Sequence, residues 1–424
     1  MLPREEAERD ALRFSDSLKA SGQTADAAKE NSKAQKSLLY PKLSFDVNYR
    51  YLTNVPIFDF NGTQTAFGAH NNYSYGPSVS YTLWDTLGNY YNYQGASRTA
   101  RSRDEQRRDD SVQLLLDARR DYVRAQEALE ELSAAGDSLT LSRSQYDDIV
   151  VRMKGGAATK LDAVEGERQV ISYQIQFAQK QAELSAALKD LLARTRDRTV
   201  VDLSHPGPPG MVGVTLGLTL DPLQKYLDET KAWQPAAPDD THPRILVHDY
   251  NAQSLALQAK SARAGLYPKV DLALFSGPTY PRGGPVNTEA YQNRAAITAS
   301  WALFDMNRTR HLTDEKKRLS EAAGHERDQA RVDLQRDFAK AVQYLASLRE
   351  QQLLAAQDVS NSAEAAKLYY QQYKLGRAIL LDVETANNRL FLARQNKARI
   401  DAETANQVDA LRAISGKEVP GWPQ

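Results

Sequence analysis

The chain contains 424 residues, and its 54 Lys and Arg residues balance its 54 Asp and Glu residues. This neutral balance gives no reason to expect a polyanionic partner such as nucleic acid. The absence of cysteine excludes disulfides, thiolate chemistry, cysteine zinc sites and a lipid-bearing N-terminal cysteine from this chain. No run of 18 apolar residues occurs, so we expect no helix to span a bilayer.

The N-terminal part predicts a helix over about residues 7–37. The first residues, 1–5, contain no apolar signal region. The chain is therefore either not secreted or shown without its signal peptide. We favour the second interpretation, in which a signal peptide has been removed.

Two strands are predicted next, because apolar and polar residues alternate over 43–51 and again over 73–83. The two strands form a predicted hairpin within residues 43–84. The connection between them, 54–72, is long and rich in Gly, Asn and Thr, which is typical of an exposed loop. The pattern returns more weakly over 270–274 and 295–303, so we expect four strands per chain.

A very long helix follows each hairpin, over about 89–153 and 309–373, with almost no Pro or Gly. Apolar residues recur there at seven-residue spacing, which predicts coiled-coil seams. The seam residues are Leu132, Leu139, Tyr146 and Met153, then Leu334, Ala341, Leu348 and Ala355 with Phe338, Leu345 and Val359. Each long helix ends at a glycine, Gly156 or Gly376, and a shorter helix returns from it.

The chain is internally duplicated. Residues 154–162 return as 374–382, a constant 220 positions later, and further upstream 39–43 return as 266–270. A repeat of this length indicates a duplicated structural unit. We predict a first repeat over 1–198 (long helix 87–153, return helix 158–195), an insert or linker over 199–242, a second repeat over 243–416 (helix 243–266, hairpin 269–304, long helix 308–373, return helix 378–415) and a tail over 417–424.

Strands with one apolar and one polar face suit a membrane β-barrel, with lipid outside and water inside. An antiparallel sheet lying on a soluble core shows the same alternation. Four strands cannot close a water-containing barrel, and lipid tolerates no open edge, so the chain is either soluble or shares a barrel with copies of itself. Three copies would give about twelve strands. Aromatic residues for interfacial girdles would be Tyr49, Tyr51, Tyr73, Tyr75, Tyr81, Trp84 and Trp301.

Several segments resemble the TolC-type outer-membrane factor (outer membrane efflux protein) family. They are Tyr373-Lys374-Leu375-Gly376-Arg377-Ala378-Ile379-Leu380-Leu381-Asp382-Val383, His242-Pro243, the stretch 259–269 and the end 410–416. The resemblance covers nearly the full length and implies a mixed α and β fold: a twelve-stranded outer-membrane barrel in a homotrimer, continuous with a long periplasmic α-helical coiled-coil barrel. It also implies docking with a periplasmic adaptor (membrane fusion protein) and an inner-membrane transporter.

Candidate gate residues follow the two turns. Asp382 and its repeat partner Asp162 would form rings of like charge at the inner mouth, which attract cations; capping of a helix start explains them equally simply. The resemblance implies a second entrance position at Thr385. It also implies a link between neighbouring helices, for which Tyr373 and Arg377 flank the turn glycine.

The turn tips are the most exposed points of the coiled coils, and we interpret them as adaptor-docking positions. They comprise Lys154, Gly155, Gly156, Lys374, Leu375 and Gly376. The first tip lacks the polar residue directly after glycine that the family usually has, and the N-terminal helix lacks the family's Asn-Pro signature.

No catalytic pattern appears. The six histidines form no metal-binding pair at i, i+4, and no nucleophile-elbow or phosphate-loop motif occurs. The paired carboxylates Asp147 and Asp148 are interpreted as a solvated helix face. We expect no enzyme, no cofactor and no metal.

The leading hypothesis is a passive exit duct in the outer membrane of a Gram-negative bacterium, with a large periplasmic part. It would conduct small molecules or proteins from an adaptor and an inner-membrane pump, in multidrug efflux or type I secretion, and would be gated at the helix tips. The alternative is a periplasmic or soluble coiled-coil scaffold without a pore.

Overall fold

The computed structural model describes residues 2–60, 62–66, 68–195, 220–282 and 288–416. It divides into two compact units. Unit 1 comprises 1–21, 107–243 and 330–424, and unit 2 comprises 22–106 and 244–329. Most of the predicted linker and the whole predicted tail lie outside the described residues.

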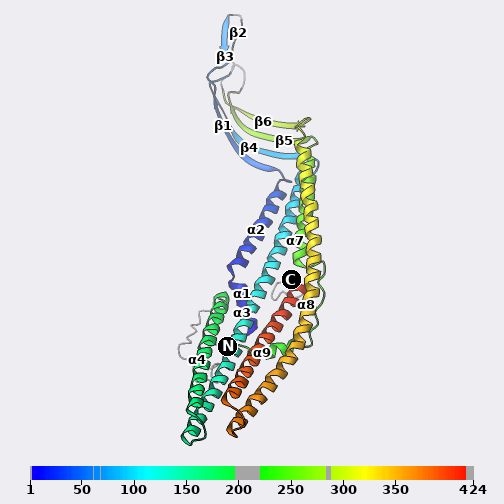
Figure 1. Cartoon of the computed structure of the whole chain (residues 1–424). Helices are drawn as coiled ribbons and strands as arrows, with labels where there is room; N and C mark the ends of the chain where they lie inside the picture. Colours follow the sequence, from blue (N-terminus) through cyan, green and yellow to red (C-terminus); the bar gives the residue numbers. More distant parts are fainter. Residues whose placement is uncertain (1, 61, 67, 196–219, 283–287, 417–424) are drawn as a thin grey trace. The chain divides into compact units, whose positions relative to one another are not determined.

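Unit 2 is built on a four-stranded antiparallel sheet of order β1-β4-β5-β6 (Figure 1). The strands are β1 (Lys42–Tyr51), β4 (Asn71–Trp84), β5 (Lys269–Tyr280) and β6 (Ala290–Ser300). The predicted hairpins are therefore present, and β4 pairs with β5 to join them into one sheet.

One sequence prediction in this unit was wrong in part. The connection 54–72, expected as a loop, contains a small separate hairpin of β2 (Ile57–Phe60) and β3 (Thr63–Ala66). Asp59 and Gly62 explain the turn, because the Gly62 N–H donates to Asp59 Oδ1 at 2.9 Å and Gly62 has a φ of 80°. Glycine adopts such a φ at no steric cost.

The apolar residues of β1 share one face of the sheet and are exposed in the single chain. Their exposure ranges from 59% at Tyr51 to 75% at Leu43, with Phe45, Val47 and Tyr49 between these values. No part of the chain that the structure describes covers this apolar face. The outer strands β1 and β6 have one neighbour each, so each leaves one row of backbone N–H and C=O groups unpaired within the described sheet.

Two glycines permit the close pairing of β4 and β5. A Cβ atom added at Gly76 would lie 2.2 Å from the Ser276 carbonyl oxygen, and one added at Gly277 would lie 2.1 Å from the Tyr75 carbonyl oxygen. Real Cβ atoms do not approach backbone this closely, so the joint between the two hairpins requires glycine on both strands.

Each hairpin passes into a long helix through the same junction. Asp85 Oδ2 accepts the Asn89 N–H at 2.7 Å, and 220 positions later Asp305 Oδ2 accepts the Thr309 N–H at 3.0 Å. The two residues after each aspartate have left-handed φ values, 54° and 66° at 86–87, then 52° and 61° at 306–307. The aspartate caps the helix and holds this strained turn.

The helices repeat with equal lengths. α3 (Gly88–Lys154) and α8 (Arg308–Lys374) have 67 residues each, and α4 (Lys160–Thr195) and α9 (Leu380–Ser415) have 36 each. The predicted seams hold in unit 1, where Leu132, Leu139, Leu334, Leu345 and Leu348 are all buried. Shorter helices are α1 (Arg4–Phe14), α2 (Asp16–Ser37), α6 (Leu223–Thr230) and α7 (Pro243–Ala264).

The predicted N-terminal helix is two helices. Ser15 interrupts it with an extended ψ of 121°, and its hydroxyl accepts the Leu18 N–H at 3.2 Å, so it caps α2. The predicted linker is also partly helical, since α6 lies within it.

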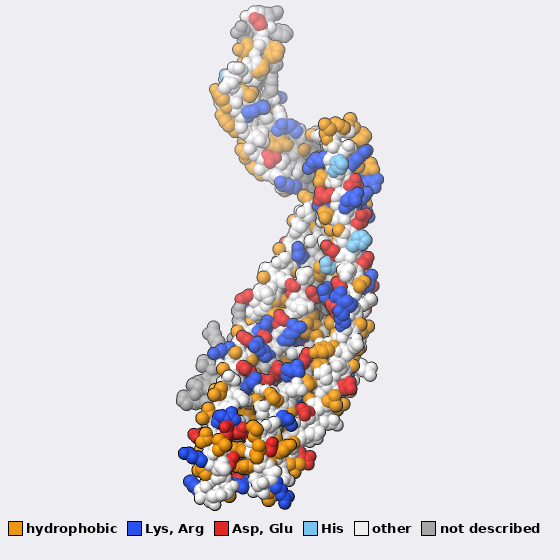
Figure 2. Space-filling view, viewed as in Figure 1, with side chains coloured by type: hydrophobic (Ala, Val, Ile, Leu, Met, Phe, Trp, Pro, Cys, Tyr) orange, Lys and Arg blue, Asp and Glu red, His pale blue; other side chains and the backbone are white. Residues whose placement is uncertain are grey.

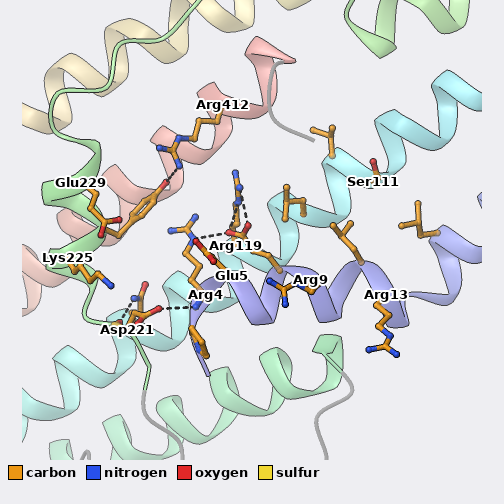
Figure 3. Close-up of a pocket in the computed structure, with 18 of the residues that line it drawn as sticks. Arg4, Glu5, Arg9, Arg13, Ser111, Arg119, Asp221, Lys225, Glu229 and Arg412 are labelled. Carbon is orange, nitrogen blue, oxygen red and sulfur yellow. Dashed lines mark hydrogen bonds and ion pairs between the residues drawn. The ribbon is translucent and has the colours of Figure 1, made fainter. Parts of the chain in front are cut away.

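α1 is anchored by buried charges in unit 1 (Figure 3). The Arg4 guanidinium contacts Asp409 of α9, and Arg119 of α3 donates to Glu8 at 2.9 Å. Arg4 also lies 3.8 Å above the ring of Tyr226, whose hydroxyl donates to Asp409 at 2.6 Å. Burial raises the pKa of Tyr226, and the neighbouring Asp409 carboxylate raises it further. The network ties α1 and α6 to both long-helix hairpins.

Among the helices that the structure describes, none combines the length and the apolar character that a membrane crossing requires.

The glycine joint gives the first prediction. Gly76→Ala should destabilise the folded protein by roughly 1–3 kcal/mol or more, because its methyl group overlaps backbone that cannot move aside. The matched control is Gly324→Ala in α8, where an added Cβ meets nothing within 4 Å and helix propensity favours alanine. Melting temperatures of the purified variants check this, and equal values for both would contradict it.

Candidate functional site: the helix tips

Both helical hairpins of unit 1 end in the same turn. At the first, the Ala157 N–H donates to the Arg152 carbonyl at 2.8 Å, and at the second the Arg377 N–H donates to Gln372 at 2.9 Å. Gly156 and Gly376 have φ values of 74° and 73°. A Cβ at either glycine would meet nothing within 4 Å. The left-handed conformation, not space, is therefore what requires glycine.

The two predicted ring carboxylates bind the starts of the return helices. Asp162 Oδ2 accepts the Thr159 N–H at 2.9 Å and its hydroxyl at 2.8 Å, while Thr159 Oγ1 accepts the Asp162 N–H at 3.1 Å. This is a complete capping box. Asp382 Oδ2 accepts only the Ile379 N–H, at 3.2 Å. Capping is thus observed at both positions, and a charge ring at the mouth stays a prediction.

One link between the two hairpins joins α3 to α8 near the tips. Tyr370 donates its hydroxyl to Asp148 Oδ2 at 2.7 Å, and Lys374 Nζ lies 3.4 Å from the same oxygen. Lys374 also lies 4.6 Å from the centroid of the Tyr370 ring. One carboxylate of the first repeat therefore holds two side chains of the second.

A second link lies one turn closer to the tip. Arg152 Nη2 donates to the Lys374 carbonyl oxygen at 3.0 Å, and its guanidinium lies 5.4 Å from the centroid of the Tyr373 ring. An arginine that satisfies a carbonyl at the end of the opposite helix fixes the separation of the two hairpin ends.

Sequence reasoning missed these partners. It interpreted Asp147 and Asp148 as a solvated helix face. Asp147 is exposed, and the Asp148 side chain, 35% exposed, also binds Tyr370 and Lys374. Arg152 and Tyr370 were not singled out. The only signal in the sequence that could have indicated these residues is that they lie a few positions before the turn glycines Gly156 and Gly376. A link between residues 222 positions apart, such as Asp148 and Tyr370, depends on how the hairpins pack.

The residues predicted for the helix link, Tyr373 and Arg377, and for the second entrance position, Thr385, make none of these contacts between the hairpins through hydrogen bonds of their side chains. The Tyr373 ring is 8% exposed and packs with Ile149, Leu380 and Val383, and its hydroxyl has no hydrogen-bond partner among the described residues. The Arg377 side chain is exposed and has no carboxylate partner in the described ranges. Thr385 is exposed and donates its hydroxyl to the Leu381 carbonyl at 2.8 Å. Their gate roles stay predictions.

The electrostatics favour an ionised carboxylate in the link. The Tyr370 hydroxyl, and after it the Lys374 ammonium, hold the pKa of Asp148 below its usual range. Burial, together with the bond to Asp148, raises the pKa of Tyr370. The pair therefore exists as carboxylate and phenol at neutral pH.

Further links join the hairpins away from the tips. Arg168 of α4 donates to Glu384 of α9 at 3.0 Å, and Asn387 donates to the buried Gln145 at 2.7 Å. These contacts lie within the same unit as the tips and hold α9 against both helices of the first hairpin.

The predicted docking residues are accessible. Lys154, Gly155, Gly156, Lys374 and Gly376 are exposed at the hairpin ends, and Leu375 is 66% exposed. Docking itself stays a prediction.

The predicted girdle residues lie on the sheet of unit 2 or directly after it. Tyr49, Tyr51, Tyr75, Trp84 and Trp301 are exposed, whereas Tyr73 and Tyr81 are half-buried. Tyr73 stacks on Tyr280 with ring centroids 5.1 Å apart.

In the part of the chain that the structure describes, no group of three or more His, Asp or Glu side chains is close enough to hold a metal ion.

The fold is that of known outer-membrane channels. The outer-membrane channel OprN superposes with a TM-score of 0.78 at 17% identity, over 98% of this chain and 90% of OprN. The outer membrane protein VceC of Vibrio cholerae gives 0.76 at 14% identity, over 97% and 96% of the two chains. The open state of the Neisseria gonorrhoeae MtrE outer membrane channel gives 0.73 at 17% identity, over 97% and 89%.

The model of the outer membrane efflux protein family matches residues 9–195 and 241–417. The chain belongs to this family, as its resemblance predicted, and the mixed α and β fold class is confirmed. No curated protein matches the sequence.

Proposed function

We propose that this protein is the outer-membrane exit duct of a tripartite export system. Three copies would form a twelve-stranded barrel, and the helices would form a tube on the periplasmic side of a Gram-negative outer membrane. The observation that carries the proposal is the sheet of unit 2, whose apolar face is uncovered and whose edge strands β1 and β6 each have an unpaired outer edge in the described chain.

Closure by further copies is a physical necessity if the sheet enters lipid, and the family resemblance implies three copies. Unpaired backbone groups at β1 and β6 would each cost several kcal/mol, on the order of the values for polar groups in hydrocarbon. Pairing β6 of one copy with β1 of the next satisfies both rows, and an even total of strands closes the barrel.

The tip link supports a gate. Asp148, Arg152, Tyr370 and Lys374 tie the two helical hairpins of one chain together at the end of the proposed tube. Release of the link would let the second hairpin move away from the first and widen the opening. The protein itself would conduct passively, and the partner pump would supply the energy.

The gate and the duct are tested together by bilayer conductance of the detergent-extracted protein. The wild type should be a trimer that inserts and conducts in small steps. Tyr370→Phe removes the hydroxyl that binds Asp148 and should raise the open fraction about tenfold or more, since a hydrogen bond to a charged group is worth about 1.5–3 kcal/mol. Tyr369→Phe is the matched control, because Tyr369 is exposed beside it.

The same recordings have a defined pH dependence. Because the pKa of Asp148 is lowered in the folded chain, its contribution is full above the unfolded value of about 3.9 and is lost as pH falls through the lowered value. The small conductance steps of the wild type should therefore persist from about pH 8 to pH 5. Unchanged conductance in Tyr370→Phe would refute the gate, and a soluble, non-conducting monomer would favour a coiled-coil scaffold instead.

Asp382 is proposed as the ring carboxylate at the mouth, in addition to its capping bond. Asp382→Asn keeps an oxygen that can accept from Ile379 but removes the charge. The preference for K⁺ over Cl⁻ should fall about fivefold, since a charge at about 4 Å in water is worth about 1 kcal/mol. Asp358→Asn, an exposed position further up α8, is the control. Equal selectivity in both variants would leave Asp382 with capping alone.

The exposed tips are proposed to dock a periplasmic adaptor. Gly376→Trp should abolish export from cells while the trimer still assembles, because the bulky ring blocks the surface of the turn. Gly376→Asn is the control, since asparagine tolerates the left-handed φ of 73° and adds little bulk. Export by the Trp variant at the level of the Asn variant would move docking elsewhere.

A further inference from the structure

Three helix ends meet beneath the sheet of unit 2. The Ser261 hydroxyl near the end of α7 donates to the Gly88 carbonyl at the start of α3, at 2.9 Å. A Cβ added at Gly265 would lie 3.4 Å from Thr309 Cγ2 at the start of α8. The Trp301 indole N–H also donates to the Leu266 carbonyl, at 3.0 Å. The end of α7 therefore lies beside the starts of both long helices.

Large apolar side chains are exposed at this place. Leu303, Phe304 and Met306 are 78%, 77% and 78% exposed, the highest values among the large apolar residues of the described chain. They occupy the short connection between β6 and α8. Figure 2 shows hydrophobic side chains gathered at the sheet end of the helices, with Lys, Arg and His side chains directly next to them.

Cationic side chains border the apolar ones on the helix side. Arg263, Arg308 and Arg310 are all exposed. Arg308 interacts electrostatically with the Asp305 carboxylate that caps α8. We call Leu303, Phe304, Met306, Arg263, Arg308 and Arg310 the junction surface.

The fold does not require these arginines. The first repeat builds the same junction with Gly88 and Tyr90 at the positions of Arg308 and Arg310. Cations in the first turn of a helix are also unfavourable, because the helix dipole is positive there. The helix dipole therefore does not explain why the second repeat carries two arginines at this point.

We propose that the junction surface binds the headgroups of anionic phospholipids, such as phosphatidylglycerol. From the sheet toward the helices, apolar side chains come first and exposed guanidinium groups follow. This order matches acyl chains and then phosphates in the leaflet on the helix side of a barrel. Arginine pairs with phosphate oxygens in bidentate fashion. The inference rests on the proposed membrane function.

The charge pattern favours lipid over a second copy as the occupant. A protein partner would have to supply carboxylates to three arginines, and the surface combines them with highly exposed aliphatic and aromatic groups. A phospholipid supplies both complements in one molecule.

The test uses the full-length trimer in detergent, titrated with dioleoyl phosphatidylglycerol or with dioleoyl phosphatidylcholine, and native mass spectrometry counts the bound lipids. The wild type should prefer phosphatidylglycerol. Arg308→Gln with Arg310→Gln should weaken its binding at least tenfold, because each basic residue contributes about fivefold near a membrane surface. Binding of phosphatidylcholine should not change.

Arg101→Gln is the matched control. Arg101 is exposed on α3 of the same unit, about 20 Å along the helix from its start. The Arg101→Gln variant should bind both lipids as the wild type does. Arg263→Gln provides an independent variant on α7 if the double variant fails to fold.

Undiminished phosphatidylglycerol binding in a variant trimer that still conducts would overturn the lipid inference alone. Dissociation of the double variant into monomers would make the junction surface a contact between copies and would also overturn it. A wild type that neither assembles nor conducts would refute the proposed function, and the lipid inference with it.

Discussion

The unpaired edges of one small sheet constrain everything else in this protein. A four-stranded sheet with an apolar face and two open edges is unstable in water and forbidden in lipid, unless other copies complete it. The glycines where β4 pairs with β5 allow the two hairpins to form one continuous sheet. Both open edges therefore belong to the same sheet.

Duplication supplies the scaffold, whereas differences between the repeats supply the proposed function. The two long helices have equal lengths and equal junctions. The tip link nevertheless uses Asp148 from the first repeat and Tyr370 from the second, and the residues 220 positions away from them, Leu368 and Val150, cannot form it. Likewise, arginines occupy only one of the two junctions.

Sequence periodicity predicted the elements closely because each element's pattern is local. The strand expected over 43–51 is Lys42–Tyr51, and the helix expected over 89–153 is Gly88–Lys154. Local capping by Ser15 split the first helix against the prediction. The tip link escaped prediction for a different reason: it depends on the axial register of two helices in separate repeats, which side-chain spacing along one helix does not specify. Asp148 alone is indistinguishable from any exposed carboxylate.

The tip link is weak enough to be opened by a partner. The Asp148 and Lys374 side chains are 35% and 46% exposed, so their ion pair is worth at most about 1 kcal/mol. The Tyr370 and Arg152 hydrogen bonds add on the order of 1–3 kcal/mol each. Reversing a 1:99 equilibrium takes about 5.5 kcal/mol of differential binding. An adaptor that gains this amount only with separated hairpins could open the tip without any energy input by the duct. The apolar cluster of Ile149, Tyr373, Leu380 and Val383 would then oppose opening more strongly than the tip link, because separation of the hairpins exposes its buried surface to water unless another surface covers it.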